Sequence, residues 1–198
     1  MKPQQLRNLY GTPTGRVSKK VLPKLEQHSR HFIAKSPMAI ISTFDTEGKV
    51  DTSPRGGEPG FVHVLDDNCI LIPDSKGNNR VDSLINIAST GRIGMLFLMP
   101  GIDETLRING AANVTAEQEY LGLFPSVQRP PKSCIVVHIE EVFLHCAKAL
   151  MRSELWNPAK YVARADFPTI SRILKDQLGG NEAVESHEDM VKRYKADL

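Results

Sequence analysis

The sequence predicts a mainly β protein in which an antiparallel barrel is flanked by helices. Short β-rich runs are joined by turn-forming residues, which is typical of hairpins. Two long strand-like segments, 104–115 and 132–145, lie close together in the chain. Helical segments do not alternate regularly with strands, which argues against a doubly wound parallel sheet. An antiparallel sheet of this size avoids exposed edges most simply by closing into a barrel.

The first third of the chain is predicted to contain an arm, a helix and two hairpins. Residues 1–18 are rich in glycine, proline and basic side chains, as expected for an arm. Residues 19–35 carry apolar side chains at helical spacing, with Ser18 as the expected N-cap. Residues 38–53 form a predicted hairpin around an Asp-Thr-Glu-Gly turn, and residues 61–73 form a second one. The expected apolar face of the helix consists of Val21, Leu25, Phe32 and Ile33.

The middle of the chain is predicted to form a helix and then an apolar strand. Residues 79–90 fit a helix that Gly91 closes, and residues 92–99 fit the strand. In the next strand, 104–115, apolar and polar residues alternate, so one face is expected to be buried and the other to meet polar surroundings. The helix is expected to bury Val81, Leu84, Ile85 and Ala88, and the alternating strand Leu106, Ile108, Ala112 and Val114.

After this strand we expect a short helix over 116–124, a loop containing Pro125, Pro130 and Pro131, and a long strand over 132–145. The remainder is predicted to be mainly helical, with a charged last helix from about Asn181. The length of 198 residues suits one domain and is short for two. We therefore expect an arm (1–18), a barrel domain (19–160) and a helical extension (161–198) packed on that domain.

Composition and charge exclude several classes of protein. The formal net charge is +2, so the overall balance calls for neither nucleic acid nor a membrane surface. Apolar runs stay well below the roughly 18 residues of a membrane span, and the polar N-terminal residues lack the apolar core of a signal peptide. Cys69, Cys134 and Cys146 form no CxxC pair and indicate buried thiols in a reducing compartment. A cytoplasmic location is expected.

A first candidate binding segment is Thr52-Ser53-Pro54-Arg55-Gly56-Gly57. Glycine lets the backbone approach a ligand closely, and the forked arginine side chain matches a phosphate group. The alternative is an ordinary polar loop.

A second candidate is the polar segment from Pro73 to Ser83, which leads from a strand into a helix and contains Asp74, Lys76, Asn78, Asn79 and Arg80. Unpaired N–H groups at a helix N-terminus favour an anion such as phosphate. The alternative is that Asn79 is only an N-cap, answered by Asp82 in a pair resembling a capping box. The two interpretations are compatible.

Two weaker candidates lie further along the chain. Arg107 is predicted to lie on the polar face of the 104–115 strand, where a salt bridge to Glu104 or Asp103 is the alternative. Arg152 lies four residues after Lys148 and one turn before the only tryptophan, Trp156. An aromatic ring beside two cations suits a planar anionic ligand, although a lone tryptophan commonly closes a core.

The six histidines give no metal site with recognisable spacing, although His28 and His31 can share a helix face. His138 and His145 are expected in or near the core. We find no GxSxG, HExxH or carboxylate pair typical of hydrolases, and no catalytic side chain can be assigned from the sequence.

The order of these segments resembles the pyridoxamine 5′-phosphate oxidase-related FMN-binding proteins. The most specific parts are SPRGG, IPDSKGNNR, LRINGAA and CAKALMRSELW, the last resembling a branch described as predicted flavin-nucleotide-binding proteins. The similarity covers about residues 30–160. It implies a six-stranded antiparallel split barrel and a homodimer with FMN sites at the subunit interface. It also implies that the FMN contacts come from Ser53, Pro54, Arg55, Gly56, Asp74, Lys76, Asn78, Asn79, Arg80 and Arg107, with Arg152 and Trp156 from the facing subunit.

The chain departs from true pyridoxamine phosphate oxidases in two places. Asn78-Asn79-Arg80 replaces a Ser-Arg-Lys segment, and the tail HEDMVKRYKADL lacks an Arg-x-His motif. The resemblance therefore implies the cofactor rather than vitamin B6 oxidation. We expect an FMN-dependent oxidoreductase with a small-molecule partner such as NAD(P)H. The alternatives are a non-catalytic flavin carrier or sensor, a haem-binding split barrel that uses His28, His31 or His63, and a deazaflavin-dependent reductase.

Overall fold

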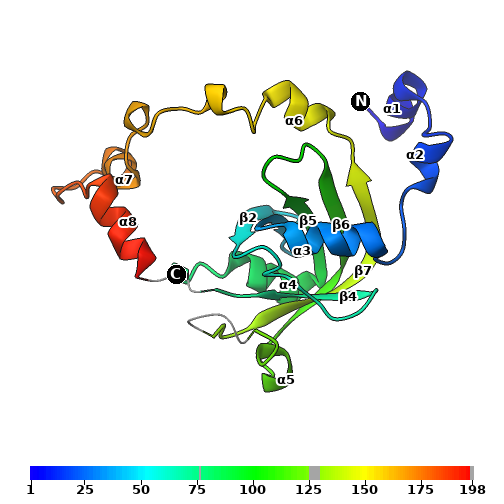
Figure 1. Ribbon diagram of the computed structural model, residues 1–198, viewed down its shortest axis with the longest axis horizontal. Coiled ribbons are helices and arrows are strands. Elements are labelled where there is room, and N and C mark those ends of the chain that lie inside the picture. The colour runs from blue at the N-terminus through cyan, green and yellow to red at the C-terminus, as the bar shows by residue number, and fades with distance from the viewer. Residues whose placement is uncertain (76, 125–129, 197–198) are drawn as a thin grey trace.

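The computed structural model describes residues 1–75, 77–124 and 130–196, and its centre is a curved antiparallel sheet (Figure 1). The strands lie in the order β2-β1-β5-β6-β7-β4-β3. A mainly β fold with flanking helices is thus confirmed. The strand count is seven rather than the expected six because a two-residue strand, β3, pairs with β4. The strands are β1 (Met38–Phe44), β2 (Val50–Gly56), β3 (His63–Val64), β4 (Cys69–Pro73), β5 (Arg92–Leu98), β6 (Thr105–Thr115) and β7 (Cys134–His145).

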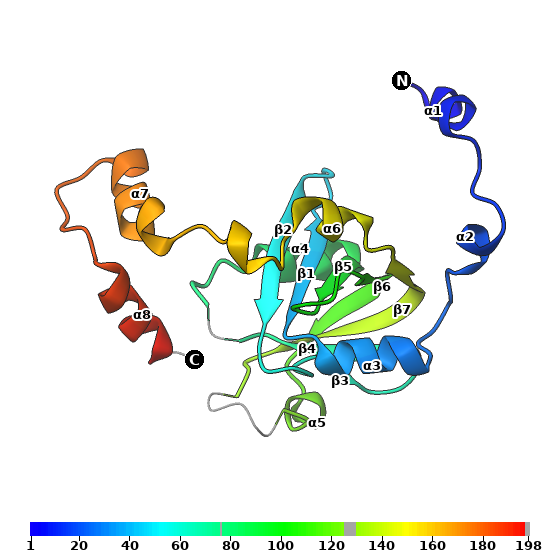
Figure 2. The same ribbon diagram turned by 45° about the horizontal axis from the view of Figure 1, so that its top comes forward.

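Helices cover the sheet and extend from both ends of the chain. Figures 1 and 2 show α3 and α4 beside the sheet, while α1, α2, α7 and α8 lie away from it. In the described parts of the chain, no helix is both long and apolar enough to cross a bilayer. The α-helices are α1 (Pro3–Tyr10), α2 (Arg16–Lys19), α3 (Gln27–Lys35), α4 (Asp82–Thr90), α5 (Gln118–Leu121), α6 (Lys148–Ser153), α7 (Ile170–Leu178) and α8 (His187–Lys195); two short 3₁₀ turns, η1 (Pro158–Lys160) and η2 (Arg164–Asp166), lie between α6 and α7.

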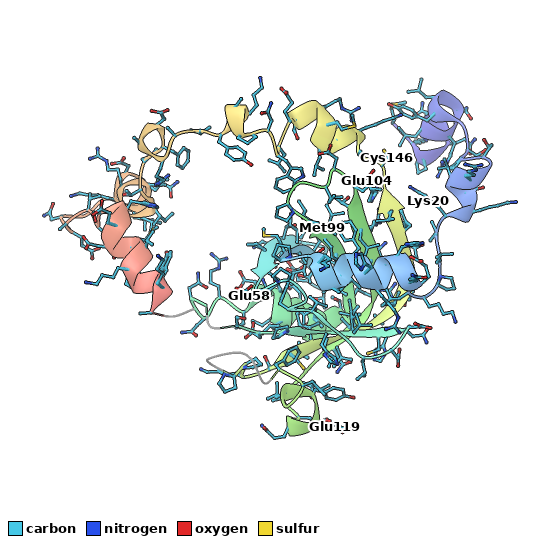
Figure 3. All side chains as sticks on the ribbon, in the orientation of Figure 1. Lys20, Glu58, Met99, Glu104, Glu119 and Cys146 are labelled. Carbon is cyan, nitrogen blue, oxygen red and sulfur yellow. The ribbon has the colours of Figure 1, made fainter. Side chains whose placement is uncertain are left out.

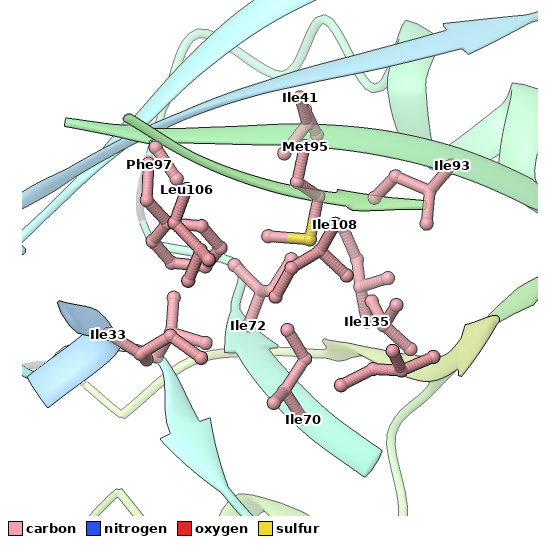
Figure 4. Close-up of a cluster of buried hydrophobic side chains, with 14 of the residues drawn as sticks. Ile33, Ile41, Ile70, Ile72, Ile93, Met95, Phe97, Leu106, Ile108 and Ile135 are labelled. Atoms are coloured by element: carbon pink, nitrogen blue, oxygen red, sulfur yellow. The ribbon is translucent and has the colours of Figure 1, made fainter. Parts of the chain in front are cut away.

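The core lies inside the curved sheet, where apolar side chains from β1, β4, β5, β6 and β7 meet Ile33 of α3 (Figure 4). The alternation predicted for β6 is confirmed, since Leu106 and Ile108 are fully buried and Arg107 is exposed. Strand β4 is buried along its whole length because both of its faces are covered. Its residues Ile70 and Ile72 face the main core. The opposite face of β4 packs against a second cluster, which includes Cys69, Leu71, Cys134, Val136 and Phe124.

Helix α3 starts later than the sequence predicted. It begins at Gln27, where the Glu26 carboxylate accepts hydrogen bonds from the amides of His28 (2.8 Å) and Ser29 (2.7 Å). The residues before it cannot continue the helix, because Leu22 exchanges two backbone hydrogen bonds with Val142 of β7. Pro23 follows directly and has no N–H to donate. The expected cap, Ser18, lies inside α2.

The existence of α4 and its end at Gly91 are confirmed, with Gly91 in the left-handed conformation (φ 67°). Of the predicted buried face only Leu84 is confirmed, since it is half-buried and packs against the main core. Ser83, Asn86 and Ile87 are buried, whereas Val81, Ile85 and Ala88 are exposed. The reason is hydrogen bonding: the Ser83 hydroxyl donates to Asp51, and the Asn86 amide donates to Thr43 Oγ1 over 3.1 Å. Hydrogen-bond partners on β1 and β2 thus make the burial of these two polar side chains favourable.

Other expectations about burial were also wrong. His138 is exposed, because its position on β7 lies on the outer face of the sheet, and His145 is half-buried. Cys146 is exposed, while Cys69 and Cys134 are buried as expected, and burial raises the pKa of both thiols.

Residues 161–196, the described part of the extension, contain no buried residue. Every residue of α6, α7 and α8 is exposed or half-buried. Residues 170–196 instead fold on themselves: the Glu185 amide donates to Ser171 Oγ (2.9 Å) and Arg193 pairs with Glu185 (2.8 Å). The packing of residues 161–198 on the barrel that the sequence predicted stays a prediction.

Candidate functional site

The two candidate segments meet because the sheet curls. Arg55 lies on β2, at one end of the strand order, and Asp74 follows β4, near the other end. Their side chains nevertheless interact electrostatically. Arg55 pairs with Ala39 of β1, which has its side chain in the core, so Arg55 projects from the inner face of β2. The convergence of the two segments therefore follows from closure of the barrel.

Arg55 is a half-buried cation with few direct partners. Its Nη1 donates to the Pro54 carbonyl (2.9 Å). No carboxylate of the described residues lies within 4.0 Å of its guanidinium nitrogens. Burial lowers the pKa of Arg55, and the charges of Asp74 and Asp51 oppose that effect. Burial likewise raises the pKa of Asp74, while Arg55 and Lys132 act in the opposite direction. The guanidinium thus keeps donors free for a ligand.

Three polar side chains join β2 to the start of α4. Asp51 and Ser53 lie two residues apart on the same face of β2, and the Ser53 hydroxyl lies 3.3 Å from Asp51 Oδ2. The Ser83 hydroxyl also donates to Asp51 Oδ2 and lies 3.3 Å from Ser53 Oγ. The sequence analysis identified Ser53 but missed Asp51 and Ser83. The i, i+2 spacing of Asp51 and Ser53 on one strand could have indicated that Asp51 lies beside Ser53. No sequence signal pointed to Ser83, because its contact with Ser53 spans 30 residues.

The residues before α4 form a tight turn. Asn78 Oδ1 accepts from the Arg80 amide (3.1 Å), and Asn79 has a positive φ of 63°, which asparagine tolerates. Asn79 is not the N-cap, since the helix begins at Asp82 and follows Val81 without a side-chain cap. Asp82 pairs with Arg80 instead (2.8 Å). Lys76 lies outside the described residues.

The glycines of the first segment have a packing role. A Cβ on Gly57 would lie 2.7 Å from the Cβ of Phe61, and one on Gly56 would lie 3.4 Å from the Pro37 carbonyl oxygen. The packing of the chain against Phe61 therefore requires a glycine at position 57, whether or not a ligand binds nearby. Gly56 ends β2 opposite Met38.

Pro54 and Arg107 lie on the other face of the sheet from Arg55. The register places Pro54 opposite Ile40, Ile40 opposite Leu96, and Leu96 opposite Arg107. Arg107 makes neither of the two salt bridges considered from the sequence; its Nε donates to Asn109 Oδ1 (3.3 Å). Within one chain the structure therefore does not bring Arg107 to Arg55.

Arg152 and Trp156 lie at and just after α6. The Trp156 indole donates to the Ile102 carbonyl (3.0 Å) in the turn between β5 and β6, and its side chain is half-buried. Arg152 is exposed. Trp156 therefore anchors the start of the C-terminal extension to its own barrel. Within the described part of one chain, neither residue contacts the Arg55 cluster, by which we mean Arg55 with Asp51, Asp74 and the start of α4.

The described residues contain no group of three or more His, Cys, Asp or Glu side chains placed to hold a metal ion. The donors around Arg55 suit an anion: a guanidinium, amides of a helix N-terminus without a side-chain cap, and a second arginine on the preceding turn, with the Asp51 and Asp74 carboxylates beside them.

Comparison with known proteins places this geometry in a family. The family model for pyridoxamine 5′-phosphate oxidase matches residues 25–146, more than half of the chain. No curated protein sequence matches. Among solved structures, HupZ from group A Streptococcus aligns with a TM-score of 0.51 at 19% identity, covering 61% of this chain and 93% of that one. An FMN-binding protein from Syntrophomonas wolfei aligns with a TM-score of 0.46 at 16% identity, covering 60% of this chain and 89% of that one. With its matching fold and the family model spanning nearly the whole barrel, the chain belongs to the pyridoxamine 5′-phosphate oxidase family.

Proposed function

We propose that this protein is an FMN-binding flavoprotein that transfers a hydride or electrons to or from a small molecule. The observation that supports it is the contact of β2 with the start of α4, where Ser83 donates to Asp51, four residues before Arg55; Arg55 and Asp74 also influence one another electrostatically. These two segments carry the donors that a ribityl phosphate requires, and only a closed barrel brings them together.

The donor set fits a phosphate monoester. Arg55 offers a forked guanidinium in half-buried surroundings, where charge-assisted hydrogen bonds are strong. The first turn of α4 adds amides that no side chain caps. Within the described residues, the Arg80 side chain forms an exposed ion pair with Asp82, and such pairs contribute about 0–1 kcal/mol. Arg80 can therefore exchange Asp82 for a phosphate at low cost.

Asp51 sets the orientation of the ligand. The hydroxyls of Ser53 and Ser83 both donate to its carboxylate. Each hydroxyl has then used its one hydrogen and can only accept a hydrogen bond from a ligand. The Asp51 carboxylate itself repels an anion. Ser53 is accordingly suited to accept from an uncharged N–H or O–H of FMN, while the phosphate lies toward Arg80 and the start of α4.

FMN, when bound, supplies the ring that accepts and releases hydride or electrons. The chain's own residues bind and orient FMN, and Arg55 adds positive charge beside its phosphate. The homodimer belongs to the same proposal: Arg107 and Pro54 on the outer face, and Arg152 and Trp156 on the extension, would reach the FMN site of a second copy. NAD(P)H is the proposed electron donor, and a cytoplasmic location is proposed with it.

The direct test is an absorption spectrum of the purified protein, with chromatographic identification of the small molecule released on denaturation. We expect a yellow protein that releases FMN, with one FMN per chain. Protein that is colourless, and remains so after FMN is added, contradicts the proposal. A Soret band after haemin is added, lost on substitution of a histidine, would favour haem instead.

Kinetics separate an enzyme from a carrier. We expect NADH or NADPH to reduce the bound FMN and a defined acceptor to reoxidise it. Tight FMN binding without turnover by any donor would make the protein a carrier or sensor.

A further inference from the structure

The net positive charge of the chain comes from residues 1–24. This segment contains six of the 25 lysines and arginines and no aspartate or glutamate. Of the formal net charge of +2, it therefore contributes +6 and the remaining residues −4. The overall balance, which by itself called for no membrane surface, thus conceals a strongly basic segment. We call residues 1–24 the basic arm; its cations are Lys2, Arg7, Arg16, Lys19, Lys20 and Lys24.

The cations of the basic arm are open to a partner. Every residue of the arm is exposed in the described chain. No carboxylate of the described residues lies within 4.0 Å of a cationic nitrogen of the arm. Arg7 Nη1 donates to the Gly11 carbonyl (3.4 Å) and Lys20 Nζ donates to the Leu144 carbonyl (3.0 Å), but a neutral carbonyl does not cancel the charge of its donor. The arm therefore presents positive charge that no ion pair among the described residues neutralises.

Helix α1 of the basic arm separates apolar from polar side chains. Leu6, Leu9 and Tyr10 follow the i, i+3, i+4 spacing and so share one face of the helix. Their exposed fractions are 44%, 64% and 79%. On the other side, the Gln4 amide donates to Asn8 Oδ1 over 3.0 Å. Large apolar side chains that are exposed together on one face indicate contact with an apolar partner.

The basic arm joins the barrel at one place and leads away from it. Leu22 exchanges two backbone hydrogen bonds with Val142 of β7. Figure 3 shows Lys20 at the same end of the sheet as Glu104 and Cys146. Earlier in the chain, α1 and α2 lie away from the sheet in both ribbon views (Figures 1 and 2). The arm can therefore contact an extended surface without any change in the barrel.

An anionic lipid bilayer matches both the charge and the apolar face of the basic arm. Clusters of about 4–8 lysines and arginines on or beside an amphipathic helix are typical of segments that bind anionic lipid headgroups. The apolar face of such a helix lies about 5–10 Å deep, at the boundary between headgroups and acyl chains. Tyrosine, such as Tyr10, is enriched at that boundary. A nucleic acid would neutralise the same cations but would leave Leu6 and Leu9 in water. The observations therefore favour a lipid surface.

We propose that the basic arm binds the surface of a bilayer that contains anionic phospholipids. Leu6, Leu9 and Tyr10 enter the headgroup layer toward the acyl chains, and the cations of the arm bind the lipid phosphates. The binding is peripheral and reversible, because a single short amphipathic helix is a weak anchor. The proposal does not rest on the flavin function, because the arm contributes no residue to the Arg55 cluster.

The test is cosedimentation of the purified full-length protein with lipid vesicles. One set of vesicles contains phosphatidylcholine alone, and the other contains equal parts of phosphatidylcholine and phosphatidylserine. We expect the protein to bind the mixed vesicles and to bind the neutral vesicles at least about tenfold more weakly. Added salt should weaken binding to the mixed vesicles, because it screens the charges. Equal binding to the two sets, or binding to neither, overturns the proposal.

Matched variants test the charge of the arm. The double variant Lys2→Gln with Lys19→Gln should weaken binding to the mixed vesicles about tenfold or more. The control, Lys192→Gln with Lys195→Gln, removes the same two charges from exposed α8 and should leave the affinity unchanged. Equal losses in the two double variants would show that only the net charge of the protein matters, which overturns the proposal.

A further variant tests the apolar face. Leu9→Gln keeps the charge of the arm and should still weaken binding to the mixed vesicles several-fold, because it removes an apolar side chain from the lipid. Unchanged affinity in Leu9→Gln contradicts the insertion of α1. Short duplex DNA serves as the competing ligand: if the protein binds it more tightly than the mixed vesicles, and Leu9→Gln leaves both affinities intact, the arm binds nucleic acid instead.

Discussion

The barrel and the two ends of the chain use apolar residues in opposite ways. Leu106 in the barrel is 0% exposed, whereas Leu178 at the end of α7 is 80% exposed. Ile170, Leu174 and Leu178 are spaced four residues apart and form an exposed stripe along one side of α7. The barrel therefore buries its apolar side chains within one chain, while α7 leaves an apolar stripe exposed within the described part of that chain.

The largest effect that tests this comparison comes from one substitution made in both regions. Leu106→Ala should lower the free energy of unfolding by roughly 2–5 kcal/mol, because it leaves a cavity in a closed core. Leu178→Ala should change it by less than about 0.5 kcal/mol, as for other exposed sites. Urea unfolding of dilute protein measures both. Equal losses for the two variants would show that the extension packs on its own barrel in solution.

Function should also depend on the barrel more than on the extension. Arg55→Gln removes the half-buried guanidinium from the proposed phosphate site, and hydrogen bonds to charged groups contribute roughly 1.5–3 kcal/mol. FMN affinity should therefore fall about 10- to 100-fold, as measured by fluorescence titration. Arg172→Gln on α7 serves as the matched control and should leave FMN affinity unchanged. A comparable loss in both variants would argue against a specific role for Arg55.

The apolar stripe on α7 should matter for self-association. In the proposed homodimer a second copy covers it, so Leu174→Glu should raise the dimer dissociation constant by about tenfold or more, the equivalent of roughly 1.4 kcal/mol. Gln177→Glu adds the same charge beside the stripe and should have little effect. Sedimentation velocity over a range of concentrations gives both constants. If the protein is monomeric, or if both variants dimerise equally, the stripe does not contact a second copy.

The smallest predicted effect concerns pH. Burial raises the pKa of Asp74 above its unfolded value. The stabilisation from the neutral carboxyl is thus complete below the unfolded pKa and is lost as the pH rises through the folded one. Asp74→Asn should therefore resemble the unaltered protein in mild acid and be relatively more stable near neutral pH. Chemical unfolding at several pH values tests the sign, and a variant that is relatively less stable at neutral pH would show that the contact with Arg55 outweighs burial.

Local patterns predicted the elements better than their contacts. The alternation in β6 and the glycine that ends α4 depend on neighbouring residues and were predicted from the sequence. The buried face of α4 was not, because Ser83 and Asn86 are buried by hydrogen bonds to residues 32 and 43 positions away. The start of α3 was misplaced for a similar reason, since Leu22 pairs with distant Val142.

In the candidate site, too, local patterns identified the segments but not the contacts between them. Sequence and resemblance identified Arg55 and the 74–80 segment separately, but their meeting requires closure of the barrel. Asp51 was missed because its role depends on a hydrogen bond from Ser83, and only the fold brings these two residues together.

The most direct test of the central claim compares FMN with riboflavin on cofactor-free protein, because the two differ only in the phosphate. If Arg55 and the start of α4 bind that phosphate, FMN should bind at least about tenfold more tightly than riboflavin. Arg55→Gln should remove most of the difference. Equal affinities for the two flavins, or a preference for FMN that Arg55→Gln leaves intact, would contradict the account.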